Sequence, residues 1–273
     1  MEYNIRLRNG LLLKGMIVSP GEQIRGIVIL VHGLGEHLRR YSHISGILND
    51  KQIGFTGMDL PGHGKSEGTR GNIRNFGVTD EMLDTLIKET RKTFPGIPLF
   101  IYGHSLGGLI VLDYLVRKNP SVKGAIVTSP WLKLAYEPSA FKLFLASVFR
   151  VIWPGLAQPS GLVVADISHD QAVVDDYTAD PLVHDKISAG LFYSAVTAAK
   201  NTLAGATNLK TPLLLMHGSD DRICSPDGSR EFASGNSKVE LRIWEGGFHE
   251  LHNETFKSEV LAQIVGWIEK QLT

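Results

Sequence analysis

The pattern of apolar and polar positions divides the chain into short, continuous apolar runs that mostly alternate with helical stretches. Each run is bounded by glycine, proline or histidine. The runs lie at residues 26–31, 53–58, 98–102, 123–128 and 212–217, and a last strand is expected at 239–244. Continuous apolar strands between helices are typical of a largely parallel sheet that is covered on both faces. The pattern therefore predicts an α/β fold with a mostly parallel central sheet.

The first twenty residues follow a different pattern, because apolar and polar residues alternate on both sides of Asn9-Gly10. The Asn-Gly pair accepts the positive φ angles of a type I′ turn, so we predict an N-terminal β-hairpin over residues 3–18. Helices on both faces of the sheet are predicted at residues 41–50, 78–93, 106–118, 227–234 and 254–271.

The alternation fails after about Trp131, where the interval to the next strand is too long for an ordinary connection. We expect residues 1–130 and 208–273 to form the core, and residues 131–207 to form a mainly helical cap insertion and its return to the core. Within the insertion, residues 138–153 are apolar on most faces. This segment is either a core helix of the insertion or a cap helix whose apolar side faces an acyl-binding cavity or a lipid interface.

Charge and cysteine content narrow the classes of function. Lys+Arg and Asp+Glu both number 28, so the net charge gives no electrostatic reason to expect nucleic acid as a partner. Cys224 is the only cysteine, which rules out an intrachain disulfide and suits a reducing interior. We find no features of a signal peptide in residues 1–10 and no apolar stretch of about eighteen residues. We therefore expect a cytoplasmic protein, with peripheral contact to membranes left open.

A candidate nucleophile lies in the segment Gly103-His104-Ser105-Leu106-Gly107. An apolar strand precedes this segment and a helix follows it, which is the context in which Gly-x-Ser-x-Gly presents a serine on a sharp turn. The backbone N–H of Leu106, at the start of the helix, would point at a developing oxyanion.

A second oxyanion donor is expected from the loop after strand 26–31. The glycines of His32-Gly33-Leu34-Gly35 allow the backbone to turn sharply, so the N–H of Leu34 can face the same point. We interpret His32 as a structural residue that bonds to the backbone near this loop rather than as a base. A plain glycine turn is the alternative interpretation of the segment.

A serine nucleophile needs a histidine base and a carboxylate, which in this fold follow it in the order acid, then histidine. Of the ten histidines, only His249 and His252 lie in a loop between the last predicted strand and the terminal helix. His249 follows a Gly-Gly turn that can bring it back over the sheet. The acid should follow strand 212–217, where Asp220 and Asp221 are adjacent, and spacing alone does not separate them.

Together these segments resemble the monoacylglycerol lipase and lysophospholipase group of the α/β-hydrolases over most of the chain outside the insertion. The resemblance rests on His32-Gly33-Leu34-Gly35-Glu36-His37, Asp59-Leu60-Pro61-Gly62-His63-Gly64-Lys65-Ser66-Glu67-Gly68, Gly103-His104-Ser105-Leu106-Gly107-Gly108, Gly218-Ser219-Asp220-Asp221-Arg222-Ile223-Cys224 and Glu245-Gly246-Gly247-Phe248-His249-Glu250-Leu251-His252. It implies that Asp221 is the acid and His249 the base, with Leu34 and Leu106 as oxyanion donors.

The resemblance also implies a substrate-binding set around the glycerol end of the substrate. By this resemblance Glu36, Arg40 and His252 would line a polar pocket, with Tyr177 close by. The alternative for Glu36 and Arg40 is an ordinary surface ion pair on a helix turn. Cys224 is expected either beside the site or as a buried inert thiol.

Two segments imitate other kinds of site. The segment 62–66 (Gly-His-Gly-Lys-Ser) looks like the end of a phosphate-binding loop, but Asp59 stands where such a loop needs a glycine. His249 and His252 have the spacing of two metal ligands on a helix, but a Gly-Gly turn precedes them and no third ligand is suggested by spacing. We therefore expect neither a metal nor a cofactor.

The sequence thus predicts a carboxylic ester hydrolase that acts on a small lipid ester, with a monoacylglycerol as the leading substrate. A lysophospholipase, a short-chain carboxylesterase and a peptidase are the alternatives within enzymes, because fold does not fix substrate. From another class of function, a ligand-binding receptor on the same scaffold stays open. A transient contact of the cap with a membrane or micelle surface also stays open, and the sequence leaves the oligomeric state undetermined.

Overall fold

The computed structural model describes residues 1–21, 23–136 and 139–273 of the chain. Within these residues, an eight-stranded sheet has the order β1-β2-β4-β3-β5-β6-β9-β10. Its strands are β1 (Glu2–Arg6), β2 (Leu12–Val18), β3 (Gly26–Val31), β4 (Ile53–Met58), β5 (Leu99–His104), β6 (Gly124–Thr128), β9 (Leu213–Gly218) and β10 (Val239–Trp244). A separate hairpin consists of β7 (Ala157–Pro159) and β8 (Lys186–Ser188).

The sheet is antiparallel at one edge and parallel elsewhere. β1 pairs with β2 and β2 with β4 in antiparallel fashion, whereas every other pair of neighbouring strands is parallel. Gly10 adopts a φ of 89° in the turn between β1 and β2, where a side chain would be strained. The predicted N-terminal hairpin and the mostly parallel α/β sheet are both confirmed.

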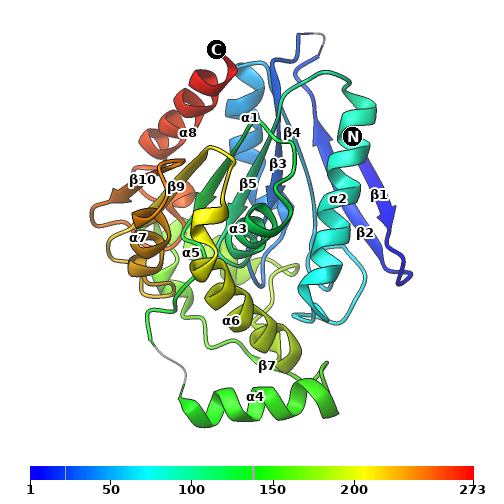
Figure 1. The fold of residues 1–273 in the computed structure, drawn as a ribbon, viewed down its shortest axis with the longest axis vertical. Helices are drawn as coiled ribbons and strands as arrows, with labels where there is room; N and C mark the ends of the chain where they lie inside the picture. Colours follow the sequence, from blue (N-terminus) through cyan, green and yellow to red (C-terminus); the bar gives the residue numbers. More distant parts are fainter. Residues whose placement is uncertain (22, 137–138) are drawn as a thin grey trace.

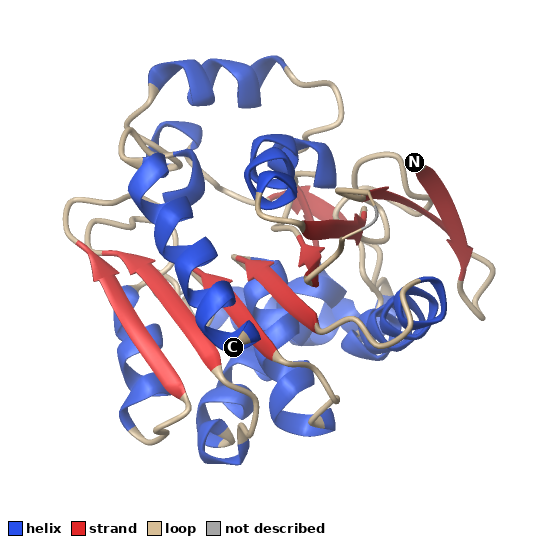
Figure 2. Cartoon of the chain, turned by 90° about the horizontal axis from the view of Figure 1, so that it is seen from above, coloured by secondary structure: helices blue, strands red, loops and turns tan. Residues whose placement is uncertain are grey.

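Helices cover both faces of the sheet, as Figure 2 shows. The α-helices of the described residues are α1 (Ser42–Asp50), α2 (Phe76–Thr93), α3 (Leu106–Lys118), α4 (Ala140–Ile152), α5 (Gln171–Ala179), α6 (Ala189–Ala204), α7 (Pro226–Ser234) and α8 (Lys257–Leu272). Ile44 of α1 and Ile264 of α8 belong to the apolar core on one face. Met82 of α2 and Leu109 of α3 belong to the core on the other face. The central strands β3, β4, β5, β6 and β9 are buried along their whole length because helices cover both of their faces.

The segment between β6 and β9 carries α4, α5, α6 and the β7–β8 hairpin. Figure 1 shows α4 at one end of the molecule, away from the central sheet, and α6 runs between them, packing against both α3 and α4. The helix predicted over residues 138–153 corresponds to α4, although residue 138 itself lies outside the described residues. The sequence analysis did not predict α5, α6 or the β7–β8 hairpin. α5 and the two strands of the hairpin are short, and the buried positions of α6 have helical spacing but are mostly small residues, which give a weak apolar signal.

None of the helices in the described part of the chain is both long and apolar enough to span a lipid bilayer.

Candidate active site

Ser105 occupies a sharp turn between β5 and α3. Its φ of 54° lies in the left-handed region, where a residue other than glycine is strained and must be held by its surroundings. Its N–H donates to the carbonyl of Thr128 (3.0 Å), and its own carbonyl accepts from Trp131 N (3.1 Å) and Leu109 N (3.0 Å). The end of β6 and the start of α3 therefore fix the backbone on which the hydroxyl sits.

The two glycines of this segment are required by close backbone contacts. A Cβ atom at Gly107 would overlap the carbonyl oxygens of Val31 and His32, and one at Gly103 would lie 2.7 Å from the carbonyl oxygen of Gly107. The turn, the first turn of α3 and the end of β3 thus pack more tightly than any side chain would allow.

His249 and Asp221 complete a hydrogen-bonded chain with Ser105. His249 Nε2 lies 2.9 Å from Ser105 Oγ, and His249 Nδ1 lies 2.7 Å from Asp221 Oδ2. Asp221 follows β9 and His249 follows β10, so the parallel strands bring both side chains to the edge of the sheet that carries Ser105. The two loops pass in close contact, since a Cβ atom at Gly218 would overlap the carbonyl oxygen of Gly247.

The environment of Asp221 keeps this buried carboxylate ionised. Its Oδ1 accepts from the N–H groups of Ile223 (2.8 Å) and Cys224 (2.9 Å), and its Oδ2 accepts from His249 and from His217 Nε2 (3.0 Å). Burial alone would raise the pKa of Asp221, but the His249 charge and the two histidine hydrogen bonds hold it well below its usual range.

The contact between Asp221 and His249 has the opposite effect on the pKa of His249. Burial opposes the charged form of His249, but Asp221, through its charge and its hydrogen bond, raises the pKa of His249 above its ordinary value of 6.5. Because Asp221 accepts at Nδ1, the Nε2 atom of the neutral ring is free to take a proton from Ser105 Oγ.

The N–H groups of Leu34 and Leu106 lie on the two backbone segments that flank Ser105. In the described part of the chain, neither donates a hydrogen bond to a protein acceptor. The loop that carries Leu34 is held by Glu36, whose Oε1 accepts from Gly33 N at 2.6 Å. Leu106 is the first residue of α3, where the N–H groups of a helix have no partner within the helix.

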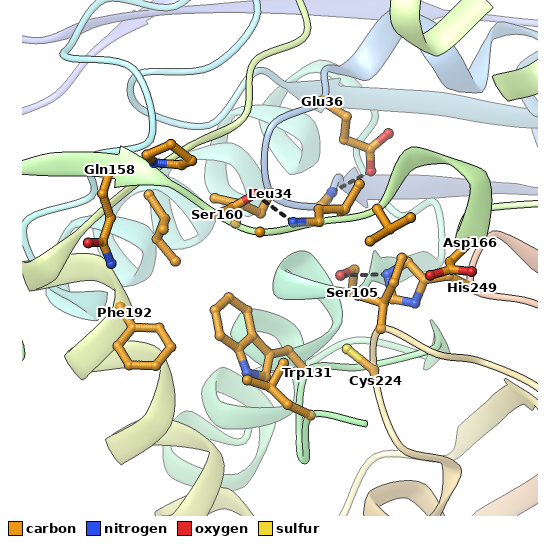
Figure 3. A pocket seen from close by; sticks show the side chains of 18 of the residues that line it. Leu34, Glu36, Ser105, Trp131, Gln158, Ser160, Asp166, Phe192, Cys224 and His249 are labelled. Carbon is orange, nitrogen blue, oxygen red and sulfur yellow. Dashed lines mark hydrogen bonds between the residues drawn. The ribbon is translucent and has the colours of Figure 1, made fainter. Parts of the chain in front are cut away.

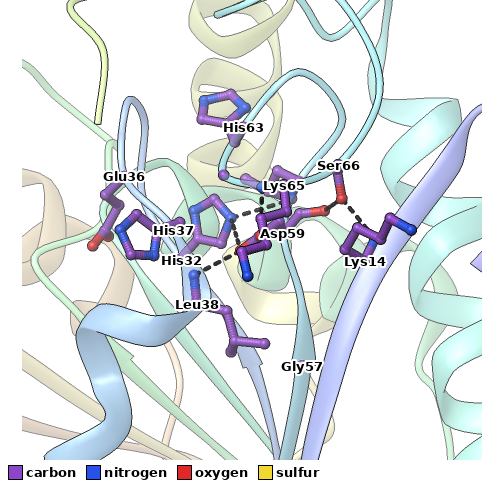
Figure 4. A network of polar contacts seen from close by, with 12 residues as sticks. Lys14, His32, Glu36, His37, Leu38, Gly57, Asp59, His63, Lys65 and Ser66 are labelled. Atoms are coloured by element: carbon purple, nitrogen blue, oxygen red, sulfur yellow. Dashed lines mark hydrogen bonds and ion pairs between the residues drawn. The ribbon is translucent and has the colours of Figure 1, made fainter. Parts of the chain in front are cut away.

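Figure 4 shows a polar network beneath this loop. His32 donates from Nδ1 to the carbonyl of Gly33 (2.9 Å) and accepts at Nε2 from the N–H of Leu60 (2.9 Å), so both ring nitrogens bind backbone, as predicted. Asp59 accepts from the N–H groups of Leu38 (2.9 Å) and Lys65 (2.8 Å). Asp59 therefore ties the segment that imitates a phosphate-binding loop to Leu38, just after the loop that carries Leu34.

The residues expected around the glycerol end form a buried ionic network. Arg40 Nη1 lies 2.8 Å from Glu36 Oε2, and its two terminal nitrogens bind both oxygens of Glu250 at 2.6 and 2.7 Å. The Tyr41 hydroxyl donates to Glu36 at 2.8 Å, and the guanidinium of Arg40 lies 4.6 Å from the centre of the Tyr177 ring. The alternative of an ordinary surface ion pair is wrong, because only 10% of the Arg40 side chain and 3% of the Glu36 side chain are exposed.

A cavity of about 600 Å³ opens beside Ser105. In Figure 3 it extends from Ser105 and His249 past Trp131 to Phe192 and Gln158. Its wall is mostly apolar and comes largely from the segment between β6 and β9. The lining includes Trp131, Leu134, Leu145, Phe149, Leu156, Ile187, Phe192 and Ile223.

Glu36 and Tyr177 line this cavity, whereas Arg40 and His252 do not. The expectation that Glu36, Arg40 and His252 line a polar pocket is therefore wrong for Arg40 and His252. The ring of His252 is fully buried and stacks at 4.7 Å on Tyr41, so aromatic packing holds it behind the cavity wall. Burial lowers the pKa of His252 to about 3, which keeps the ring neutral.

The spacing of His249 and His252 does not produce a metal site. Both ring nitrogens of His249 are used by Ser105 and Asp221, and His252 is held separately. Within the described residues, no group of three or more histidine, cysteine or acidic side chains is arranged to hold a metal ion.

Cys224 lies against the cavity and is 1% exposed. Burial raises the pKa of its thiol well above the ordinary value, so the thiol stays protonated and does not compete with Ser105 as a nucleophile.

Sequence reasoning missed Glu250 and His217. Glu250 lines the cavity and binds Arg40, and its position directly after His249 was the available signal. His217 is the last residue but one of β9, where a histidine in an otherwise apolar strand was the signal.

The fold and this site define an α/β-hydrolase with a serine, histidine and aspartate at the carboxyl edge of the sheet. The family model described as serine aminopeptidase, S33 matches residues 22–256. The chain is 31% identical to a monoacylglycerol lipase of Mycolicibacterium smegmatis, over 93% of this chain and 91% of the relative. It is also 36% identical to an uncharacterized abhydrolase domain-containing protein of Dictyostelium discoideum, over 90% of this chain, and spans 26% of that protein's length.

A solved structure has the same fold along nearly its whole length. The crystal structure of Paleococcus ferrophilus monoacylglycerol lipase has a TM-score of 0.88 and 33% identity, and the match covers 95% of this chain and 99% of that one. The chain therefore belongs to the serine aminopeptidase S33 family of α/β-hydrolases. The predicted resemblance and the predicted class, a serine hydrolase of carboxylic esters, are confirmed.

Proposed function

We propose that this protein hydrolyses monoacylglycerols to fatty acid and glycerol through an acyl-enzyme on Ser105. One observation carries the proposal. The hydrogen-bonded chain from Asp221 through His249 to Ser105 opens onto a cavity whose wall is mostly apolar and which also carries the carboxylates of Glu36, Asp166 and Glu250. The names of the Mycolicibacterium and Paleococcus relatives support the same substrate.

Acylation begins when His249 Nε2 takes the proton of Ser105 Oγ, which lies within hydrogen-bond reach. Oγ attacks the ester carbonyl carbon, and the negative charge that forms on the carbonyl oxygen is stabilised by the N–H groups of Leu34 and Leu106. Asp221 stabilises the imidazolium. His249 then protonates the leaving glycerol oxygen, and the acyl group stays on Ser105.

Deacylation repeats these steps with water in place of the alcohol. His249 removes a proton from water, the hydroxide attacks the acyl carbonyl at the same oxyanion position, and Ser105 Oγ recovers the proton as the fatty acid leaves. The low pKa of Asp221 keeps this carboxylate ionised through both half-reactions.

The apolar wall suits an acyl chain, and the other wall suits hydroxyl groups. Glu36 and Glu250 both line the cavity, and the cation behind them, Arg40, is already bound to both. Arg222, which also lines the cavity, is paired with Asp166 at 3.3 Å. Because both arginines are paired and three carboxylates line the cavity, the site favours a neutral glycerol and disfavours the phosphate of a lysophospholipid.

We further propose that residues 1–130 and 208–273 act as the hydrolase core and residues 131–207 as a cap that supplies the acyl-binding wall. Leu145 and Phe149 of α4 line the cavity, whereas Phe144 (61% exposed) and Ile152 (74%) of the same helix face outward. An apolar helix face that is exposed beside the cavity would contact a lipid surface from which the substrate is drawn.

This contact is testable by sedimentation with phosphatidylcholine vesicles. Ile152→Asp should reduce vesicle binding and activity on emulsified substrate, and it should leave activity on a dissolved short-chain ester unchanged. Ile47→Asp, on an exposed apolar residue of α1 that does not line the cavity, is the control that asks whether the effect is specific to α4. Unchanged vesicle binding in Ile152→Asp would remove the proposed contact.

The experiment for the main proposal compares wild type and Ser105→Ala on a medium-chain p-nitrophenyl ester and on 1-monoacylglycerols. We expect an initial burst of p-nitrophenol and covalent labelling by a fluorophosphonate in the wild type alone. A protein that takes no label and hydrolyses no ester would be a non-catalytic receptor. Preference for lysophosphatidylcholine, for short acetyl esters or for an aminoacyl arylamide would instead identify a lysophospholipase, a carboxylesterase or a peptidase.

A further inference from the structure

A second histidine contacts the aspartate of the site from the side opposite His249. His217, at the end of β9, is fully buried, and its Nε2 lies 3.0 Å from Asp221 Oδ2 and 3.1 Å from the carbonyl oxygen of Cys224. Its Nδ1 lies 2.7 Å from the hydroxyl of Ser229 in α7. The residues thus form one buried row from Ser229 to Ser105.

The chemistry of the partners determines the direction of these hydrogen bonds. An ionised carboxylate and a backbone carbonyl only accept, so Nε2 of His217 carries the hydrogen. In the neutral ring, Nδ1 then accepts from the hydroxyl of Ser229. The Asp221 carboxylate and the Cys224 carbonyl therefore fix the tautomer of His217, and the Ser229 hydroxyl, which can donate or accept, satisfies its Nδ1 atom.

We infer that His217 is a positioning residue for the hydrolytic reaction, and that it acts by donating a hydrogen bond to the same oxygen of Asp221 that binds His249. This inference rests on the proposed function of Ser105, His249 and Asp221. Two donors on one oxygen fix the rotation of the carboxylate, and each draws charge away from the other.

Because His217 and His249 bind the same oxygen of Asp221, a change at His217 should alter the pKa of His249. Without the donor at His217, Oδ2 of Asp221 offers its full charge to His249, so His249 holds its proton more strongly. The acid limb of the pH profile of kcat/KM should then move to higher pH, because His249 must be neutral to take the proton of Ser105.

The other groups that face His249 stay in place when His217 is changed. They are the buried titratable side chains of Glu36, His104, Asp221, Glu250 and His252. A shift of the acid limb can therefore be assigned to the contact between His217 and Asp221.

The test uses two polar substitutions of similar size. The side-chain nitrogen of glutamine can reach the place of His217 Nε2, whereas asparagine is one carbon shorter and reaches only the place of Nδ1. His217→Asn should lower kcat about 10-fold with KM within twofold, and should move the acid limb up by about half a pH unit. His217→Gln should restore both quantities to within about twofold of wild type.

Proton NMR gives a readout that packing would not change. The proton between His249 and Asp221 should resonate further downfield in His217→Asn than in wild type, since the remaining hydrogen bond is stronger, and His217→Gln should return it. Circular dichroism and fluorophosphonate titration establish that each variant is folded before the rates are compared.

Two results would overturn the inference. One is an acid limb and a kcat that stay unchanged in His217→Asn, and the other is an equal loss in the asparagine and glutamine variants, which would indicate packing alone. If His217→Asn does not fold, Ser229→Ala replaces it. We then expect a smaller upward shift of the acid limb of the pH profile. An unchanged acid limb in Ser229→Ala would count against the inference. A wild type that hydrolyses no ester would instead refute the proposed function, so the two failures are distinguishable.

Discussion

The buried cation of the site offers a prediction about stability that can be worked from the structure. Arg40 is 10% exposed in its side chain, and it makes three hydrogen bonds of 2.6–2.8 Å to Glu36 and Glu250. Arg40→Met keeps much of the apolar stem but leaves two buried carboxylates without their cation.

Breaking a buried ion pair by removing one partner costs about 3–5 kcal/mol, because the remaining charge is left desolvated. For a chain of this size, about 1 kcal/mol corresponds to roughly 2–4 °C in Tm. Arg40→Met should therefore lower Tm by about 10 °C at pH 7. The loss should come with lower activity, since Glu36 also holds the N–H of Gly33 in the oxyanion loop.

Arg39 provides a matched control one residue away. It pairs with Glu2 at the surface, with 44% of its side chain exposed, and exposed pairs contribute about 0–1 kcal/mol. Arg39→Met should therefore change Tm by no more than about 3 °C. Thermal unfolding followed by circular dichroism measures both variants.

The pH dependence gives a second check with a defined sign. In the wild type, burial opposes ionisation of Glu250, but Arg40 holds the pKa of Glu250 far below its ordinary value, so its stabilising contribution persists until the pH falls through that low pKa. In Arg40→Met burial acts alone, the pKa of Glu250 rises, and protonation relieves the desolvated charge. The gap in Tm between wild type and Arg40→Met should narrow from pH 7 to pH 4. A gap that is no larger than that of Arg39→Met, or that widens toward pH 4, would refute the reasoning.

Further predictions concern the reaction. Ser105→Ala should lower kcat by roughly 10⁴-fold or more without loss of Tm, and a residual rate within 100-fold of wild type would exclude Ser105 as the nucleophile. Asp221→Asn should lower kcat about 10⁴-fold, and a loss below tenfold would show that Asp221 does not assist His249 in the reaction. Because the pKa of His249 is raised above 6.5, kcat/KM should fall as the pH drops through a value above 6.5, and a midpoint near 5 would contradict the role of the Asp221 contact. Phe149→Ala should weaken binding of a dodecanoyl ester by about 1–2 kcal/mol relative to a butanoyl ester, measured as the ratio of their kcat/KM values. Equal losses on the two esters would show that Phe149 does not contact the acyl chain.

The sequence predicted the parts of the site that depend on local order along the chain. The segment around Ser105 carries its own strand, turn and helix, and the glycines at 103 and 107 indicate the tight contacts that the structure shows. The position of His249 after a predicted strand also indicated it as the base. The same argument did not distinguish Asp220 from Asp221 as the acid. Only the fold separates them, because the side chain of Asp221 binds His249 while that of Asp220 accepts from Ser219.

The sequence alone predicted the sheet, the helices α1, α2, α3, α7 and α8 and the candidate nucleophile, since these follow from apolar period and from turn chemistry within a few residues of each other. Tertiary structure alone decided which distant side chains meet. It buried Arg40 between Glu36 and Glu250, placed His252 behind the cavity wall against Tyr41, and set His217 on the aspartate opposite His249. The contacts of Arg40 with Glu250 and of Tyr41 with His252 join residues that lie far apart along the chain, so no local pattern specifies them. Arg40 and Glu36, like His217 and Asp221, are only four residues apart, but their burial depends on the packing of distant segments, and burial gives these contacts their energetic weight.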